Sequence, residues 1–320
     1  MASIIRTNSS SFSKKAIIWL FVLLLFIALP LYISLIEIDQ SRSSFSTVSL
    51  VRSLKLAEGE NVTKRFAAYG YNIDEIKRGN ADVPNLFLEK LPRELTTLKD
   101  IDVKKDLFIA TLLPPILKVN EYILYERKRL LKIINFIEIN GKAPSKDLFW
   151  LRRKMIRYRM TEFSIEELYS RMNIIPPSLA LTQAAIETGW GSSRFAQDAN
   201  ALYGQWTWND DEGIIPLGRE DGKTHSIKKF NNLISAVESY ALNLNTHKAY
   251  EDFRIERTKY QEPQDIDVNS LLITLIFYSE RGYEYIDNLS NIIRINQLSR
   301  FDHSKLKKNS FQEFRLGPNS

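Results

Sequence analysis

An uncharged apolar run near the N-terminus constrains the organisation of this chain more than any other feature. Residues 16–36 read AIIWLFVLLLFIALPLYISLI and contain no charged side chain. A helix needs about 20 apolar residues to cross a bilayer. Trp19 and Tyr32 lie near the two ends of the run, where amphipathic rings favour the membrane interface. We therefore predict a transmembrane helix over residues 16–36.

The charges on either side of this run predict its orientation. Three basic residues lie in the tail formed by residues 1–15, and Glu37 and Asp39 follow the run. The positive-inside rule then places the tail in the cytoplasm. We expect a single-pass protein of the inner (cytoplasmic) membrane, with its C-terminal domain in the periplasm or outside the cell. A cleaved signal peptide is the alternative, but its apolar core spans only about 7–15 residues.

Composition excludes several classes of function. The chain has 44 Lys and Arg against 38 Asp and Glu, and it shows no basic stripe interleaved with aromatics, so we expect no nucleic-acid partner. It has no cysteine, which excludes disulfides, thiolate metal sites and a cysteine nucleophile. The three histidines, His225, His247 and His303, are too scattered to form a metal site. We therefore expect neither a metal nor a cofactor.

The first half of the extracytoplasmic part divides into two segments. Residues 37–84 are interpreted as a stalk, and residues 85–163 as a helical region, because apolar residues recur there among charges at helical spacing. Leu124, Leu131 and Ile134 share one face of a helix in this region. Two consecutive prolines at 114–115 are expected to break the pattern.

Several local signals place elements in the second half of the chain. Ser164 and Glu167 form a capping-box pattern that opens a short helix, and Ser235 and Glu238 form a second one, which opens a helix through about Leu244. Further signals predict helices over 177–188, closed by a glycine, and over 270–277 and 289–298. Asp221-Gly222 lies between two short segments of strand character, which is a strong hairpin signal. The fold class is therefore mainly α, with one small β-hairpin.

One glutamate stands out because of its position in the helix over 177–188. Ala180, Ala184 and Glu187 share one face, and Glu187 falls in the last turn. The helix dipole and apolar neighbours both disfavour the ionised carboxylate there, so its pKa should be raised. A carboxyl group that is protonated near neutral pH can protonate a glycosidic oxygen. The alternative is a solvated surface glutamate.

The sequence around Glu187 resembles that of a known protein family. QAAIETGWGSSRFAQ, from Gln183, is followed by NALYGQW, by FNNLISAVESYALNLNTHKAY over residues 230–250, and by YSERGYEYIDNLSNII over 278–293. Together these segments resemble the glucosaminidase domain, the family 73 glycoside hydrolases, over about residues 165–298. The upstream segment DLFIATLLPPILKVNEYILYERKRLL is similar to the membrane-anchored, Bax-like branch of these proteins.

The resemblance implies a lysozyme-like fold, an α+β arrangement of helices with a small β-lobe. It implies an endo-β-N-acetylglucosaminidase that acts on the glycan strands of peptidoglycan. The catalytic glutamate of the family corresponds to Glu187, and a tyrosine in a Tyr-x-x-x-Leu element corresponds to Tyr285, which would position the reacting sugar. We place the catalytic domain at residues 164–300 and a polar tail at 301–320.

The second carboxylate of the reaction is less evident. In the family it comes from the β-lobe, which here contains five acidic residues; of these we favour Glu212. If none of the five serves, the N-acetyl group of the substrate could act as the nucleophile. For binding the sugar we consider an amide and four aromatic side chains near the expected cleft: Asn200, Trp190, Tyr203, Trp206 and Trp208. Packing is the alternative role for these aromatics.

Three interpretations of the function remain open at this point. The first is a membrane-anchored hydrolase that uses Glu187 as a general acid. The second is a lytic transglycosylase or muramidase type of cleavage of the same polymer, which also needs one glutamate at a helix end. The third is a non-catalytic module that binds glycan. The products released from peptidoglycan distinguish the three.

Overall fold

The computed structural model describes residues 53–56, 61–207, 209, 211, 213–214 and 226–308. The predicted transmembrane segment, residues 16–36, and two predicted site residues, Trp208 and Glu212, lie outside the described residues. The described part belongs to one compact unit, residues 47–320. It is mainly helical with one small antiparallel sheet, which confirms the expected fold class.

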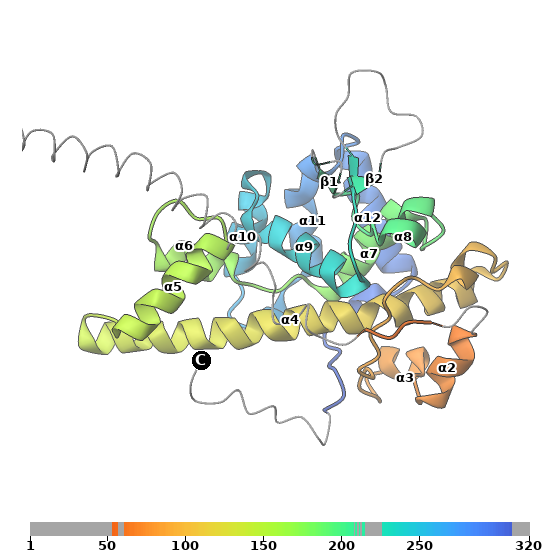
Figure 1. Cartoon of the computed structure of the whole chain (residues 1–320), viewed down its shortest axis with the longest axis horizontal. Helices are drawn as coiled ribbons and strands as arrows, with labels where there is room; N and C mark the ends of the chain where they lie inside the picture. The colour runs from red at the N-terminus through yellow and green to blue at the C-terminus, as the bar shows by residue number, and fades with distance from the viewer. Residues whose placement is uncertain are drawn as a thin grey trace, which may run out of the picture. The chain divides into compact units, whose positions relative to one another are not determined.

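The longest element is helix α4 (Ile101–Asn140), which lies along the base of the domain (Figure 1). Asp100 caps its N-terminus by accepting hydrogen bonds from two backbone N–H groups, and Gly141 ends it in the left-handed conformation at φ 76°. The predicted break at the two prolines is wrong, because the helix continues through Pro114 and Pro115. Both rings are buried among apolar side chains, and that burial outweighs the missing backbone hydrogen bonds.

The buried face of the C-terminal half of α4 differs from the face predicted from the sequence. Ile123, Leu130 and Ile133 are buried, whereas Leu124 and Leu131 are exposed by 37% and 39%. The predicted face was thus displaced by one residue, or about 100° around the helix. The apolar residues here occupy both faces, so their spacing alone did not identify the buried one.

Helix α4 is also long and apolar enough to span a membrane. Among the described residues it is the one such helix, but 78% of its apolar window is buried inside the protein. It packs against α7 (Pro177–Thr188) and α9 (Leu233–Thr246). This burial identifies α4 as a core helix of the domain.

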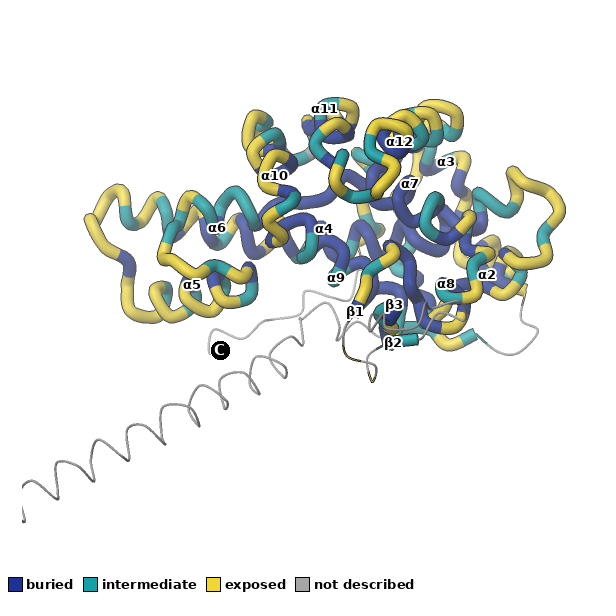
Figure 2. The backbone as a smooth tube through the Cα atoms, turned by 90° about the horizontal axis from the view of Figure 1, so that it is seen from above, coloured by how far each residue is buried: buried dark blue, intermediate teal, exposed yellow. Residues whose placement is uncertain are grey.

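Helix α7 is the central element of the fold. It packs against α4, against α12 (Tyr283–Ile295) and against the 3₁₀ helix η7 (Leu298–Phe301), and nearly all of its residues are buried (Figure 2). Pro177 opens it and Gly189 closes it at φ 57°, so both predicted boundaries are confirmed. Its interior position explains its small, uncharged residues, since larger ones would not fit between three neighbours.

The remaining elements surround this core. They are α2 (Val62–Ala68), α3 (Ile73–Lys77), η2 (Arg93–Thr96), α5 (Ser145–Arg157), α6 (Ile165–Arg171), α8 (Arg194–Ala199), η4 (Lys248–Tyr250), α10 (Glu251–Thr258), η5 (Pro263–Asp265), α11 (Val268–Leu272) and η6 (Ile273–Tyr278).

Two predicted boundaries of the domain need correction. Part of the expected stalk is folded, since α2 and α3 contribute buried Phe66 and Ile76 to the core. Part of the expected polar tail is folded as well. Phe301 is fully buried, and the backbone of Val83 forms a parallel bridge with Leu306. Apolar side chains in these short segments find partners far away in the sequence, which local composition does not reveal.

The two capping-box predictions had different outcomes. Ser164 caps α6, where its hydroxyl accepts a hydrogen bond from the Glu167 N–H at 3.1 Å. Helix α9, however, begins at Leu233 rather than at Ser235. Asn232 is its cap and accepts from the Ser235 N–H at 2.9 Å, while Glu238 forms an ion pair elsewhere. An asparagine side chain can accept hydrogen bonds from the free N–H groups of the first helical turn as well as a serine can. The sequence alone therefore did not distinguish Asn232 from Ser235 as the N-cap.

The last two predicted helices were also only partly correct. The region 270–277 is divided between α11 and η6, and α12 begins at Tyr283, earlier than the expected 289. Gly282 precedes α12 at φ 55°, a conformation that glycine adopts readily, and this allows the chain to turn directly into the helix.

The small sheet contains β1 (Trp206–Thr207), β2 (Gly213–Ile214) and β3 (Ser226–Lys228) in the order β1-β3-β2. Both pairs are antiparallel, with Trp206 opposite Ile227 and Gly213 opposite Lys228. The pairing of β2 with β3 confirms the predicted hairpin. Its turn lies outside the described residues.

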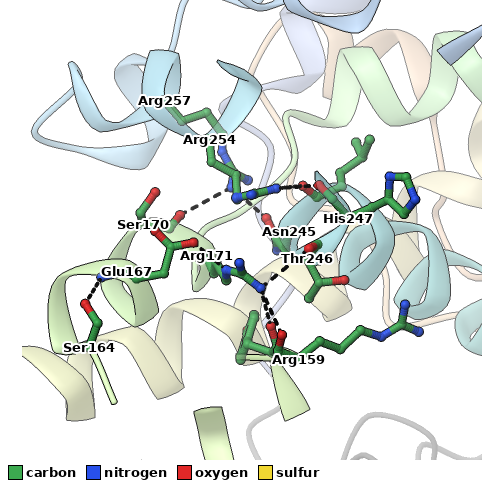
Figure 3. Close-up of polar contacts among 12 residues, drawn as sticks. Arg159, Ser164, Glu167, Ser170, Arg171, Asn245, Thr246, His247, Arg254 and Arg257 are labelled. Atoms are coloured by element: carbon green, nitrogen blue, oxygen red, sulfur yellow. Dashed lines mark hydrogen bonds and ion pairs between the residues drawn. The ribbon is translucent and has the colours of Figure 1, made fainter. Parts of the chain in front are cut away.

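Buried arginines hold the segment that leads into α7, and Figure 3 shows one of them, Arg257, beside Asn245. Arg257 is fully buried, and its guanidinium donates to the carbonyl of Ile174 at 2.7 Å and to Oδ1 of Asn245 at 2.6 Å. Arg127 donates to the carbonyl of Met172 at 2.8 Å. Burial lowers the pKa of Arg257 to about 9. These bonds satisfy carbonyls at the end of α6 and fix the direction in which α7 starts.

Candidate active site

Glu187 occupies the last turn of α7, immediately before the glycine that ends the helix. Gly189 and Trp190 both adopt left-handed conformations, at φ 57° and 56°, and they turn the chain away from the helix axis. The Glu187 side chain is therefore not covered by its own chain and is only half-buried. The helix ends here because glycine tolerates the left-handed conformation that stops it.

A directed chain of hydrogen bonds converges on the Glu187 carboxyl group. The Tyr285 hydroxyl donates to Oε1 of Glu187 at 3.3 Å. Gln183 Nε2 donates to the Tyr285 hydroxyl at 3.0 Å, and the Tyr240 hydroxyl donates to Oε1 of Gln183 at 2.5 Å. Gln183 and Glu187 lie four residues apart, on one face of α7. Tyr285 is on α12 and Tyr240 on α9, so three helices build the arrangement.

Two opposing influences act on the pKa of Glu187. Burial raises it, while the hydrogen bond from Tyr285 and the positive charge of Arg281 lower it. The net effect is a pKa above the ordinary value of a glutamate, because desolvation is the largest of the three influences. Such a carboxyl group holds its proton at a higher pH than a solvated glutamate does, as the sequence predicted.

Aromatic rings line the site behind Tyr285. Tyr278 stacks on Tyr285 at 5.7 Å between ring centroids, and Tyr250 lies 5.9 Å from Tyr278. Tyr203 stacks on Tyr240 at 3.8 Å. The Tyr278 hydroxyl donates to the carbonyl of Tyr203 at 3.0 Å, which ties the segment after α8 to η6. Burial raises the pKa of both Tyr250 and Tyr278, and the charge of Glu187 raises it further, so these two rings belong to the surroundings of the carboxyl group.

Gly204 lies close to the second oxygen of the carboxyl group, Oε2. Its φ is +61°, and a Cβ atom built on it would lie 3.0 Å from Oε2 of Glu187. A side chain at this position would push against the carboxyl group. The motif Asn-Ala-Leu-Tyr-Gly therefore needs its glycine for two reasons, backbone conformation and the space beside Glu187.

Three of the predicted binding residues, Trp190, Asn200 and Tyr203, have side chains that pack against the rest of the protein. Trp190 packs edge-on against Phe108 at 5.5 Å, with Lys105 over its ring. Asn200 is 1% exposed and donates to the carbonyl of Phe230 at 3.0 Å, and Tyr203 is 2% exposed. Their side chains therefore support the loops around the site.

Trp206 differs from these three residues because it is 51% exposed on strand β1. Of the predicted binding residues that the structure describes, it is the most exposed aromatic residue. A flat exposed ring suits the apolar face of a sugar.

Sequence reasoning missed Gln183, Tyr240, Tyr250 and Tyr278. Helical spacing could have identified Gln183, because it lies one turn before Glu187 on the same face. The tyrosines come from three separate segments, and no local pattern shows that they meet.

Comparison with known proteins agrees with this geometry. Residues 164–298 match the glucosaminidase family, described as mannosyl-glycoprotein endo-beta-N-acetylglucosaminidase. Protein bax of Escherichia coli (strain K12) is 28% identical over 201 residues, which cover 61% of this chain and 70% of that protein. No solved structure matches the chain. The match spans α6 to α12 and includes Glu187, Gln183 and Tyr285, and it confirms the resemblance noted in the sequence. Over residues 164–298 the chain therefore carries a glucosaminidase domain, a domain of glycan-cleaving hydrolases.

Proposed function

We propose that this protein is a peptidoglycan hydrolase, an endo-β-N-acetylglucosaminidase in which Glu187 is the general acid. The observation that carries the proposal is the Glu187 carboxyl group itself. It lies at the end of a helix, is partly desolvated by burial, and accepts a hydrogen bond from buried Tyr285. A protonated carboxyl group in such a setting is suited to protonate the leaving oxygen of a glycosidic bond.

The two carboxyl oxygens of Glu187 have different surroundings, and this assigns their roles. Oε1 accepts a hydrogen bond from the Tyr285 hydroxyl. The proton that Glu187 transfers therefore resides on its other oxygen, Oε2, which lies beside Gly204. As the bond between the anomeric carbon and the leaving oxygen breaks, that proton moves to the leaving oxygen. The carboxylate left behind is stabilised by the Tyr285 hydroxyl and by the charge of Arg281. Water then adds to the anomeric carbon and loses a proton, which returns to the Glu187 carboxylate and restores the acid.

A second group must stabilise the positive charge that develops on the sugar. We assign this role to Glu212 of the β-lobe; the N-acetyl group of the substrate is the alternative. Trp206, which is exposed, and Trp208 are assigned to the faces of neighbouring sugar rings. The hydrolase is proposed to be held at the inner membrane by residues 16–36, with the catalytic domain on the outer side.

One observation favours a second candidate, the lytic type of cleavage. Glu187 lies in the last turn of α7, and a single acid–base residue at a helix end would also serve this reaction. A reaction in which a hydroxyl of the substrate attacks its own anomeric carbon needs one acid–base residue and no second carboxylate. It releases an anhydro end, whereas hydrolysis releases a reducing end.

Analysis of released products tests the proposal. The full-length protein in detergent, its Glu187→Gln variant and a matched Glu138→Gln control are each incubated with purified peptidoglycan. Glu138 is an exposed residue of α4, far from the site in sequence. We expect reducing N-acetylglucosamine ends from the wild type and the control, and a loss of about 10²–10⁴-fold in Glu187→Gln.

The other outcomes are equally informative. Anhydro ends would establish the lytic reaction in place of hydrolysis. Equal products from all three proteins would show that Glu187 is not the acid. Binding of glycan by folded protein without any turnover would identify a non-catalytic binding module.

A further inference from the structure

The α4–α5 hairpin is far more basic than the rest of the chain. Residues 118–160 contain twelve Lys and Arg and four Asp and Glu, a net charge of +8, whereas the whole chain carries +6. The remainder is therefore slightly acidic. A charge difference of this size within one protein indicates a local partner of opposite charge.

The basic residues that face the interior of the hairpin are paired with carboxylates. Arg129 lies 3.3 Å from Asp147, and Lys154 and Arg157 form ion pairs with Glu126 and Glu238. Each of these partners is on the inward side of α4, α5 or α9. The inner cations are thus explained by the fold.

The outer face of α5 is different. Lys146, Arg152 and Arg153 are exposed, and within the described ranges no ion pair is found for them. Phe149 and Ile156 lie on the same face and are exposed by 63% and 50%. Positions 149, 152, 153 and 156 follow the i, i+3, i+4, i+7 spacing of a single helical stripe. Figure 2 shows α5 at the periphery of the domain with exposed residues along it.

We propose that this stripe binds the surface of an anionic lipid bilayer. Its three cations match phosphate head groups, and each cation near an anionic membrane surface strengthens binding by about fivefold. Phe149 and Ile156 then enter the boundary between head groups and acyl chains, as the apolar residues of interfacial helices do. A hydrated acidic glycan or an acidic protein surface would use the cations but would leave these two apolar side chains in water.

The position of α5 adds a structural consequence. Ion pairs of Arg129 with Asp147 and of Lys154 with Glu126 hold α5 against the C-terminal half of α4, and α4 packs against α7, which carries Glu187. Binding of α5 to a bilayer therefore orients the catalytic domain relative to the membrane. The proposal concerns lipid binding and does not depend on the hydrolase reaction, so either can fail without the other.

The absence of cysteine makes a direct test possible with the full-length protein. A single cysteine is introduced by Phe149→Cys, labelled with an environment-sensitive fluorophore, and reconstituted in lipid nanodiscs. The discs contain phosphatidylcholine alone or phosphatidylcholine mixed with phosphatidylglycerol. Asp287→Cys, an exposed position on α12, is the matched control label. We expect a blue shift and quenching by spin-labelled lipid at position 149 only, and only in the anionic discs.

Charge-reversal variants test the contribution of the cations. Arg152→Glu/Arg153→Glu is compared with Lys90→Glu/Lys99→Glu, which changes the net charge equally. Lys90 and Lys99 are exposed and precede α4. The ion pairs of α5 with Glu126 and Arg129 place α5 about 40 Å along α4 from its start. The arginine variant should lose the response at position 149 and the lysine variant should keep it, while circular dichroism confirms that both are folded.

Three results would overturn the proposal. One is an equal response in neutral and anionic discs, and another is a response that survives the arginine reversal. The third is a label at position 149 that responds to isolated peptidoglycan and not to phosphatidylglycerol, because the stripe would then bind glycan. Raising the salt concentration should weaken the lipid response, since surface charges are screened.

Discussion

The Tyr285 hydroxyl donates its hydrogen bond to Glu187 across 98 residues of sequence. The tyrosine is 1% exposed, so its hydroxyl cannot turn to water and remains directed at the carboxyl group. The bond favours the ionised carboxylate and opposes the effect of burial. Tyr285 thus lowers the pKa of Glu187, and in the proposed reaction it would stabilise the charge left after proton transfer.

Replacement of Tyr285 by phenylalanine should shift the pH dependence of the reaction. The active form of a general acid is protonated, so the rate falls as pH rises through the pKa of Glu187. Loss of the Tyr285 bond raises that pKa, and the alkaline limb of the profile should move to higher pH. The maximal rate should fall about tenfold to a hundredfold, since hydrogen bonds to charged groups contribute about 1.5–3 kcal/mol.

Tyr283→Phe serves as the control for this measurement. Tyr283 is on the same helix and is 67% exposed. Its variant should keep both the rate and the position of the alkaline limb. A limb that stays in place in Tyr285→Phe would show that this hydrogen bond does not act on the reacting acid.

Two glycine substitutions should separate stability from activity. Gly204 and Gly189 both have positive φ, so alanine at either should cost about 1–2 kcal/mol of folding free energy. Only at Gly204 does the added Cβ meet Glu187, at 3.0 Å from Oε2; at Gly189 nothing lies within 4 Å. Urea unfolding should therefore give similar losses, whereas the rate per folded molecule should fall only in Gly204→Ala. Equal rates would mean that the space beside Oε2 is not used.

The hydrogen-bond chain through Gln183 should appear as coupling between two substitutions. Gln183 and Tyr240 are both buried, so Gln183→Leu leaves the Tyr240 hydroxyl without its partner, at a cost of about 1–3 kcal/mol. Tyr240→Phe removes that hydroxyl as well. In a double-mutant cycle of unfolding free energies, the double variant should be more stable than the two single effects predict. Strict additivity would show that the bond contributes no coupling.

The N-terminus of α7 should make stability depend on pH. Asp302 accepts hydrogen bonds from the N–H of Ser178 at 2.8 Å and from its hydroxyl at 2.7 Å, and burial raises the pKa of Asp302 to about 6. An aspartate in the unfolded chain has a pKa of about 4. Between these values the folded state binds the proton more tightly, so stability falls as pH rises through this window and is constant above it.

Asp302→Asn has no such titration and should show a flatter dependence. The difference between wild type and variant should change by about 2–3 kcal/mol between pH 4 and pH 7. Urea unfolding at a series of pH values measures it. Parallel curves for the two proteins would contradict the assignment.

The site was partly predictable because its key residue belongs to a local pattern. Pro177 and Gly189 mark the ends of α7 by their own backbone preferences, which no tertiary contact needed to override. Glu187 was identified from its place in that helix together with the resemblance of the surrounding sequence to the glucosaminidase domain. The partners of Glu187 come from α9 and α12, and their meeting depends on how three helices pack, which local sequence does not encode.

The errors in the fold have the same origin. Pro114 and Pro115 disfavour a helix locally, yet both are buried within α4, where packing decides the outcome. Phe66 and Phe301 lie in short segments that lack helical periodicity, and each is buried by parts of the chain far away in sequence. Local signals predict where elements start and stop better than they predict what those elements touch.

The hydrogen bonds between Asp302 and Ser178 show that the folded unit extends beyond the region matched by the family. The region shared with the family ends at residue 298, but Ser178, inside it, is capped by Asp302, outside it. Helix α4, which packs against α7, also lies outside the matched region. A backbone bridge between Val83 and Leu306 joins the segments before and after that region. The region that matches the family is thus smaller than the unit that folds. A fragment of residues 164–298 alone would lack both α4, on which α7 packs, and Asp302, which binds the N-terminus of α7.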